Sequence, residues 1–203
     1  MGQEKVIKKT SSSKEGFLIT ELQVSGVGSE LDGITILQLS DFHFGPATKA
    51  SHLRKAIEIS NSLEPDYAVL TGDFIQLSHI GLRHFVAKKF GPEIIHFRDF
   101  RRSISVAAKD LAEIISGLKV REKIFGVFGN HDHHEGVSSV RRQLNPLLTW
   151  LNNENVSLSK GLHLAGIDDY RNGIPDLDKV VQNIPDQDQF NICLLYTSDA
   201  ADE

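Results

Sequence analysis

Three segments of the chain carry side chains of the types that bind metal ions. Each segment directly follows an apolar run, "ILQLS", "YAVLTG" or "IFGVFG". The side chains are, in the same order, Asp41 and His43, then Asp73, then Asn130, His131 and Asp132. Carboxylate, imidazole and amide groups together suit Mn, Fe or Zn better than an ion that prefers thiolates. The residue types therefore predict a metal site wherever the fold brings the three segments together.

Two such ions can hydrolyse phosphate esters when they lie about 3.5–4 Å apart, because together they activate water and bind the oxygens of an in-line displacement. A carboxylate can bridge two ions, and Asp73 is the natural candidate because it lies between the other two segments in the sequence. His131 could then stabilise developing charge or protonate the leaving oxygen. The three segments therefore predict chemistry at phosphorus.

The apolar runs predict buried strands over residues 33–40, 66–73 and 123–130. A helix is expected from residue 49 to the residue before Pro65, with Leu53, Ala56, Ile57 and Ser60 on one face. Helices broken at Gly91-Pro92 are expected over residues 75–119. Strands that alternate with helices indicate an α/β fold with parallel pairing. Since ligands bind at the carboxyl ends of parallel strands, the fold class itself predicts that the three segments meet.

The glycines that precede Asp73 and Asn130, Gly72 and Gly129, would let backbone and ligands approach closely. Two other groups near the site are interpreted as ordinary surface features: His133 and His134 as solvated side chains rather than substrate contacts, and Asp168-Asp169 as a strand-ending turn rather than part of the cleft. The remaining expected elements are an edge strand over residues 17–26, a helix over 138–155, short strands over 156–167, a small helix over 175–184 and a last strand over 190–195.

Composition describes an ordinary globular protein, with 203 residues, 40% hydrophobic and 24% charged. A formal net charge of −5 gives no strong signal for a nucleic-acid partner. Apart from Cys193 the chain has no cysteine, which excludes a disulfide framework and fits a reducing compartment. We therefore expect a cytoplasmic protein, with peripheral contact to the inner face of the membrane as an open alternative, and we draw no prediction for its oligomeric state.

The motifs Asp41-x-His43, Gly72-Asp73 and Gly129-Asn130-His131-Asp132 together resemble the calcineurin-like metallophosphoesterase family, in its smaller bacterial branch. The resemblance covers most of residues 33–192. It implies a metallophosphoesterase-type α/β fold, in which a β-sandwich with flanking helices surrounds a βαβαβ core. It also implies two divalent metal ions (Mn, Fe or Zn) and a role for each residue: ligation of the first ion by Asp41 and His43, bridging by Asp73, ligation of the second ion by Asn130, catalysis by His131, and orientation of His131 by Asp132.

The function that the resemblance implies is dinuclear metal-dependent hydrolysis of a phosphoester or pyrophosphate bond by a metal-bridging hydroxide. The substrate would be a phosphorylated small molecule, a nucleotide-sugar or a lipid-linked compound. Basic side chains and phenylalanines interleave in residues 82–102, which could cap the cleft, dock a phosphate or contact anionic lipid; a solvated helix face is the default interpretation. The alternative function is a non-catalytic binding module that keeps the fold.

The C-terminal segment departs from the family pattern. The pattern continues with a histidine after a strand resembling "FNILLSH" and then with Gly-His-x-His, whereas this sequence continues "FNICLL" and then "YTSDAADE". Residues 193–203, "CLLYTSDAADE", resemble the translation of a sequencing adaptor. We therefore expect a flexible polar tail over residues 1–15, the N-terminal portion of a single domain over 16–192, and a non-native tail over 193–203. A chain that ends in this way is expected to be marginally stable and inactive, unlike its full-length parent.

Overall fold

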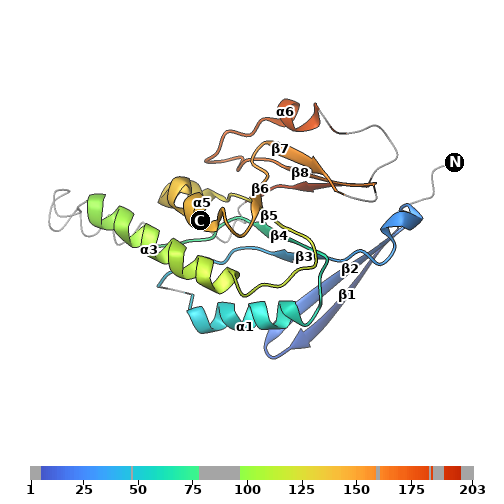
Figure 1. Ribbon diagram of the computed structural model, residues 1–203, viewed down its shortest axis with the longest axis horizontal. Coiled ribbons are helices and arrows are strands. Elements are labelled where there is room, and N and C mark those ends of the chain that lie inside the picture. Colours follow the sequence, from blue (N-terminus) through green and yellow to red (C-terminus); the bar gives the residue numbers. More distant parts are fainter. Residues whose placement is uncertain are drawn as a thin grey trace.

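The structure is a computed structural model that describes residues 6–46, 48–77, 97–158, 161–182, 184 and 190–197 (Figure 1). Its strands are β1 (Val6–Lys14), β2 (Phe17–Ser25), β3 (Ile36–Leu39), β4 (Tyr67–Thr71), β5 (Ile124–Val127), β6 (Thr149–Trp150), β7 (Glu154–Ser157), β8 (Leu162–Gly166) and β9 (Phe190–Leu194). Its helices are α1 (Ala50–Asn61), α3 (Phe97–Ile115), α4 (Asn130–Glu135), α5 (Val137–Leu144) and α6 (Leu177–Val181), with a 3-10 turn at Ser29–Leu31.

A four-stranded parallel sheet of order β3-β4-β5-β6 forms the centre of the fold. Helix α1 connects β3 to β4 and buries Leu53, Ile57 and Ser60, which lie on the face expected from the sequence. The last helical residue is Asn61, so the helix ends before Pro65 as expected, and Glu64, which directly precedes the proline, has a non-helical φ of 49°. The predicted alternation of parallel strands and helices is therefore confirmed.

A second sheet of order β7-β8-β9 packs against the central sheet and completes a sandwich. Alternate residues of β4 serve the two sides, because successive side chains of a strand point to opposite faces. Ala68 and Leu70 pack in the core that contains the residues of α1 and α3, whereas Tyr67 and Val69 pack with Leu164 of β8. Figure 1 shows α1 and α3 on one side of the central sheet and β7 and β8 on the other. The α/β sandwich with flanking helices is thus confirmed.

Two elements differ from their predictions. The run Ile36–Leu39 was expected to be buried on both faces, but β3 is the edge strand of the central sheet and is only half-buried. The single helix expected over residues 138–155 is wrong: α5 ends at Leu144, and Thr149–Trp150 form strand β6 beside β5. Pro146 follows the C-cap Asn145, and a proline there cannot continue the hydrogen bonding of the helix.

The N-terminal segment forms a hairpin rather than the expected flexible tail over residues 1–15. Strand β1 pairs with β2 in an antiparallel register that runs from Val6 opposite Ser25 to Lys14 opposite Phe17. The two turn residues, Glu15 and Gly16, both have positive φ (51° and 87°), the backbone twist that a tight hairpin requires. Polar β-formers such as the Thr and Ser of β1 carry no apolar alternation, which is why the sequence does not show this strand.

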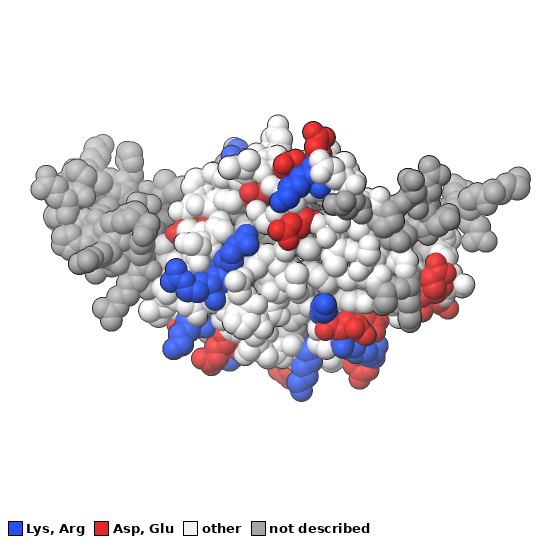
Figure 2. Space-filling model, turned by 45° about the horizontal axis from the view of Figure 1, so that its top comes forward, with Lys and Arg blue, Asp and Glu red and all other residues white. Residues whose placement is uncertain are grey.

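Two further predictions concern residues 82–102 and residues 193–203. Most of residues 82–102 lies outside the described residues, so the basic, phenylalanine-rich section stays a prediction. Strand β9 includes Cys193 and Leu194, so the structure builds the beginning of the expected non-native tail into the second sheet. Within the described part, no helix is both long and apolar enough to cross a membrane. Figure 2 shows basic and acidic side chains interspersed on one face of the molecule.

Candidate metal centre

The segments that carry the predicted ligands meet at the carboxyl ends of β3, β4 and β5. The loops that follow β3 and β4 run side by side, because Asp41 N–H donates to Gly72 O (3.2 Å) and His43 N–H donates to Asp73 O (2.9 Å). Helix α4 begins at Asn130, three residues after the end of β5. The central sheet therefore places segments that lie far apart in the sequence next to one another.

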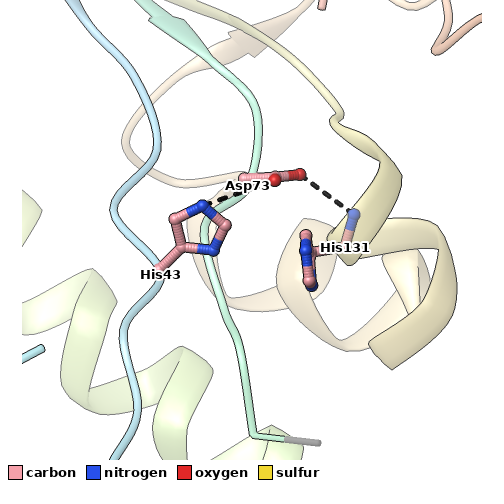
Figure 3. Close-up of side chains that lie close together, drawn as sticks. All are labelled: His43, Asp73 and His131. Carbon is pink, nitrogen blue, oxygen red and sulfur yellow. Dashed lines mark hydrogen bonds and ion pairs between the residues drawn. The ribbon is translucent and has the colours of Figure 1, made fainter. Parts of the chain in front are cut away.

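Three ligand groups lie close enough to share one cation (Figure 3). Ligand atoms of His43, Asp73 and His131 all lie within 4.8 Å of one another. His43 Nε2 is 3.6 Å from Asp73 Oδ2 and also 3.6 Å from Asp41 Oδ1. The rings of His43 and His131 meet edge to face with centroids 5.0 Å apart. His131, which the sequence assigns to catalysis, therefore lies among the ligand atoms as well.

Two buried oxygens show that this cluster fits a metal ion. The Asp73 side chain is fully buried, and a buried carboxylate is costly without a positive charge beside it. Asn130 is 8% exposed, and its Oδ1 is buried with no hydrogen-bond partner among the described residues. A buried amide oxygen without a partner is rare in native proteins. Both oxygens would be satisfied by a hard or borderline cation, whereas coordination by each named residue stays a prediction.

Gly72 and Gly129 make this close approach possible, as predicted. A Cβ at Gly72 would lie 2.7 Å from Gly129 N, and a Cβ at Gly129 would lie 2.2 Å from Asp73 Oδ1. Gly72 also has φ of +81°, which side chains disfavour. A larger residue at Gly129 would push the Asp73 carboxylate away from its present place, and one at Gly72 would push apart the two backbone segments that meet there.

The backbone of the site is strained. Asp41, His43 and Asp73 have φ of 56°, 41° and 54°, and they are three of the six non-glycine residues with positive φ in the described part of the chain. The left-handed conformation costs a non-glycine residue about 1–2 kcal/mol. Such conformations persist where the surroundings over-determine them, and they cluster at functional sites. The strain therefore marks the same residues that the motifs single out.

Asp132 holds the backbone of the site in place. Its side chain is fully buried and accepts hydrogen bonds from the backbone N–H groups of Gly129 (2.9 Å), Asp73 (2.9 Å) and Phe74 (2.9 Å). These bonds join the start of α4 to the loop that follows β4. The sequence assigns Asp132 the orientation of His131, and the bonds named here reach His131 through the backbone of α4. A catalytic part for Asp132 stays a prediction.

Asp132 predicts a pH dependence of stability in the metal-free chain. Burial raises the pKa of Asp132 to about 7 and the nearby Asp73 carboxylate adds to the effect, although the three N–H donors oppose it. Between pH 4 and 7 the folded chain then binds a proton that the unfolded chain has lost, so the free energy of unfolding falls as pH rises, by about 4 kcal/mol at most, and levels off above pH 7. Urea unfolding in EDTA across this pH range measures the slope.

The control for this prediction is Asp132→Asn, which cannot titrate. The variant is less stable at pH 4 because an amide can accept at only one of the two oxygen positions. Its stability should nevertheless lose the part of the slope that Asp132 contributes. Identical slopes in the two proteins would contradict the prediction.

Tyr196 reaches the site from the end of β9. Its hydroxyl lies 2.8 Å from Asp41 Oδ1 and 2.7 Å from Asp73 Oδ2. Burial raises the pKa of Asp73, and the Tyr196 hydrogen bond only partly offsets this. Partial burial also raises the pKa of Asp41, but hydrogen bonds from His43, Ser40 and Tyr196 outweigh it, so the pKa lies below its ordinary value. The sequence offers no signal for this contact, since Tyr196 falls in the segment expected to be non-native.

Tyr196→Phe is expected to tighten metal binding by this 203-residue chain. The hydroxyl lies between two carboxylate oxygens that a cation would need and can donate its one hydrogen to either of them, and a hydrogen bond to a charged group contributes about 1.5–3 kcal/mol. Removing this competition should strengthen Mn²⁺ binding by about tenfold or more, measured by calorimetric titration. Tyr170→Phe is the matched control because Tyr170 is 77% exposed. Unchanged or weaker binding by Tyr196→Phe would contradict the expectation.

His133 differs from its interpretation as a solvated side chain, whereas Asp168 lies in the turn that follows β8, as expected. His133 Nε2 lies 2.8 Å from Asp168 Oδ1, and the side chains are only 18% and 7% exposed. His134 is exposed, as expected, and its Nε2 accepts a hydrogen bond from Asn172 Nδ2 at 2.9 Å. The sequence signal that could have found the first pair is weak, because a histidine after a motif and an aspartate after a strand are both common on surfaces.

Known proteins resemble the part of the chain that contains the central sheet and the site. The family model of the calcineurin-like phosphoesterases matches residues 34–193. An uncharacterized metallophosphoesterase of Helicobacter pylori is 26% identical over 73% of this chain and 35% of its own length. The UDP-2,3-diacylglucosamine pyrophosphatase LpxG of Chlamydia trachomatis is 34% identical over 32% of this chain and 21% of its own length. A transmembrane protein with metallophosphoesterase domain from Danio rerio is 36% identical over 26% and 12%, respectively.

Proposed function

Because the chain belongs to the calcineurin-like phosphoesterase family, we propose that the whole protein hydrolyses a phosphoester or pyrophosphate bond with two divalent metal ions held at this centre. The chain spans about a third of the length of the first curated relatives it matches, so the activity is proposed for the whole protein. The observation that carries the proposal is the convergence of His43, Asp73 and His131 within 4.8 Å at the carboxyl ends of parallel strands.

The proposed ligands are Asp41 and His43 for the first ion, Asp73 as the bridge, and Asn130 for the second ion. Mn, Fe and Zn suit this set of carboxylate, imidazole and amide ligands. When bound, such ions polarise phosphoryl oxygens and lower the pKa of water. The buried Asp73 carboxylate favours binding of the ions, because a cation beside it removes the cost of an uncompensated buried charge.

His131 is proposed as the catalytic residue that protonates the leaving oxygen or stabilises developing charge. Its backbone N–H donates to Asp73 Oδ1 at 2.9 Å, so its Cα is tied directly to the proposed bridging carboxylate. Its half-buried ring stands edge to face with the ring of His43. From this place the imidazole can stabilise charge on a phosphoryl group or protonate the leaving oxygen.

The proposed substrate is a phosphorylated small molecule, a nucleotide-sugar or a lipid-linked pyrophosphate. The name of the Chlamydia relative, a UDP-2,3-diacylglucosamine pyrophosphatase, supports this choice across the third of the chain that it matches. The basic, phenylalanine-rich residues 82–102 would suit contact with an anionic lipid surface. A cytoplasmic protein that contacts the inner face of the membrane is the localisation that we propose on this basis.

Hydrolysis assays on the whole protein test the proposal. The protein is loaded with Mn²⁺, Fe²⁺ or Zn²⁺ and offered p-nitrophenyl phosphate, bis(p-nitrophenyl) phosphate and a UDP-sugar. We expect turnover of at least one probe, loss of turnover in EDTA and recovery on adding metal. No turnover of any probe with any of the three metals would overturn the proposal.

A further inference from the structure

We propose that Asp168 and His133 form a brace that positions α4, and with it His131, for the reaction. The inference rests on the proposed function, and it adds two residues that the motifs do not include. His133 lies on α4, and Asp168 lies two residues after β8 of the second sheet. The 2.8 Å contact between His133 Nε2 and Asp168 Oδ1 therefore joins α4, beside the central sheet, to the loop after β8 of the second sheet.

Asp168 is a rigid anchor for this brace. Its Oδ1 also accepts from Asp169 N–H (2.9 Å), and its Oδ2 accepts from Ile174 N–H (2.9 Å). Its own N–H donates to Asn153 Oδ1 (3.0 Å). Partial burial raises the pKa of Asp168, but the hydrogen bonds from Ile174 and His133 outweigh it and hold the pKa below its ordinary value. A carboxylate fixed by several backbone contacts loses little further freedom when His133 binds it.

The His133 ring is also confined. It meets the ring of Phe128 edge to face, with centroids 6.3 Å apart and an interplanar angle of 74°. Phe128 in turn stacks on Trp150 at 3.9 Å, in the core between the central sheet and its helices. Because the carboxylate can only accept, Nε2 must carry the hydrogen of this contact. Both partners of the brace are thus held in one orientation by their surroundings.

Helix α4 has only six residues, and besides an exposed bond from Asn172 to His134 its other side-chain anchors are buried carboxylates that bind a single loop. The Asp132 carboxylate reaches the loop after β4, and Glu135 Oε1 accepts from Leu77 N–H (3.1 Å) in the same loop. The His133 contact reaches the loop after β8 instead. With contacts to both sheets, the helix cannot rotate about its Asp132 anchor. A displacement of about 1 Å at a reacting group can cost roughly a hundredfold in rate. The brace would therefore affect the rate by fixing the position of the His131 side chain.

The experiment compares His133→Phe with His133→Gln in the whole, metal-loaded protein. Phenylalanine keeps the ring but has no donor, whereas glutamine restores an N–H that reaches Asp168. We expect kcat for the best aryl phosphate to fall by about 10- to 100-fold in His133→Phe. We expect KM, the Mn²⁺ stoichiometry and the melting midpoint to stay near the wild-type values. His133→Gln should recover kcat to within about threefold, and His52→Phe, at an exposed histidine of α1, is the control.

A second readout does not depend on hydrolysis. In the metal-free protein, the His131 amide resonance and its hydrogen exchange report the bond to Asp73 Oδ1. We expect exchange to accelerate by about tenfold in His133→Phe but not in His133→Gln or His52→Phe. If the wild type hydrolyses none of the probes, the proposed function fails while this readout still decides the brace.

Three results would overturn the brace. The first is an unchanged His131 amide in His133→Phe. The second is an equal loss of kcat in His133→Gln and His133→Phe. The third is a rise in KM at constant kcat, which would make His133 a substrate contact. If His133→Phe does not fold, His133→Asn replaces it, because this side chain keeps the amide but is one methylene too short to reach Asp168.

Discussion

Asp73→Ala is expected to abolish binding of the metal pair and to lower turnover of the whole protein by about a thousandfold or more. Asp73 contacts the other two residues of the ligand cluster: its Oδ1 accepts from His131 N–H, and its Oδ2 lies 3.6 Å from His43 Nε2. It is also the proposed bridge between the ions. The several kcal/mol that metal ions supply to a transition state would be lost together with them.

Metal analysis and steady-state hydrolysis measure this effect. Asp66→Ala is the matched control, because Asp66 precedes the same strand at its opposite end and binds Thr35 and Arg121 instead. The control should lose stability but keep both metals and turnover. A variant of Asp73 that still binds two ions per chain would show that the bridge is assigned to the wrong residue.

His131→Ala is expected to lower kcat by about 10²- to 10⁴-fold, the range that general acid–base catalysis contributes, while both metal ions stay bound. This outcome separates two roles for His131, since its ring lies within 4.8 Å of the ligand atoms of His43 and Asp73. If His131 is a ligand, metal is lost along with activity. If the protein is a binding module, neither this variant nor Asp73→Ala changes turnover measurably, because the wild type has none to lose.

The measurements are kcat, KM and metal content for the variant and for His52→Ala. His52 is an exposed histidine of α1 whose ring stacks on Phe17, with centroids 4.6 Å apart. Its removal should leave turnover and metal content unchanged. Loss of metal from His131→Ala, with turnover restored by excess Mn²⁺, would contradict the catalytic assignment.

Much of the fold could be predicted from the sequence because its determinants are local. The apolar runs before Asp41, Asp73 and Asn130 each became a parallel strand, as a continuous apolar run predicts, although β3 at the sheet edge is only half-buried. The second sheet was foreseen in part, through the strands at residues 156–167 and 190–195. Strand β6 was missed because its two residues follow α5 so closely that they continue its apolar pattern.

The site divides in the same way. The motifs identified Asp41, His43, Asp73, Asn130 and His131 as neighbours, because chain order and parallel pairing suffice to place residues at one sheet edge. They could not show that Asp132 binds three backbone N–H groups, because the spacing of residues along the chain does not determine which backbone groups a buried carboxylate reaches. Nor could they show the left-handed backbone of Asp41, His43 and Asp73.

The sequence by itself determined the family, the chemistry of the metal ligands and the edge of the sheet where they meet. Each of these depends on short contiguous segments: the motifs themselves and the apolar runs that precede them. Only the tertiary structure decided which polar side chains hold that edge together. The contact of His133 with Asp168 joins residues 35 positions apart, and that of Tyr196 with Asp73 joins residues 123 apart. Such contacts depend on how the second sheet packs against the first, and packing is a property of the assembled core rather than of any one segment.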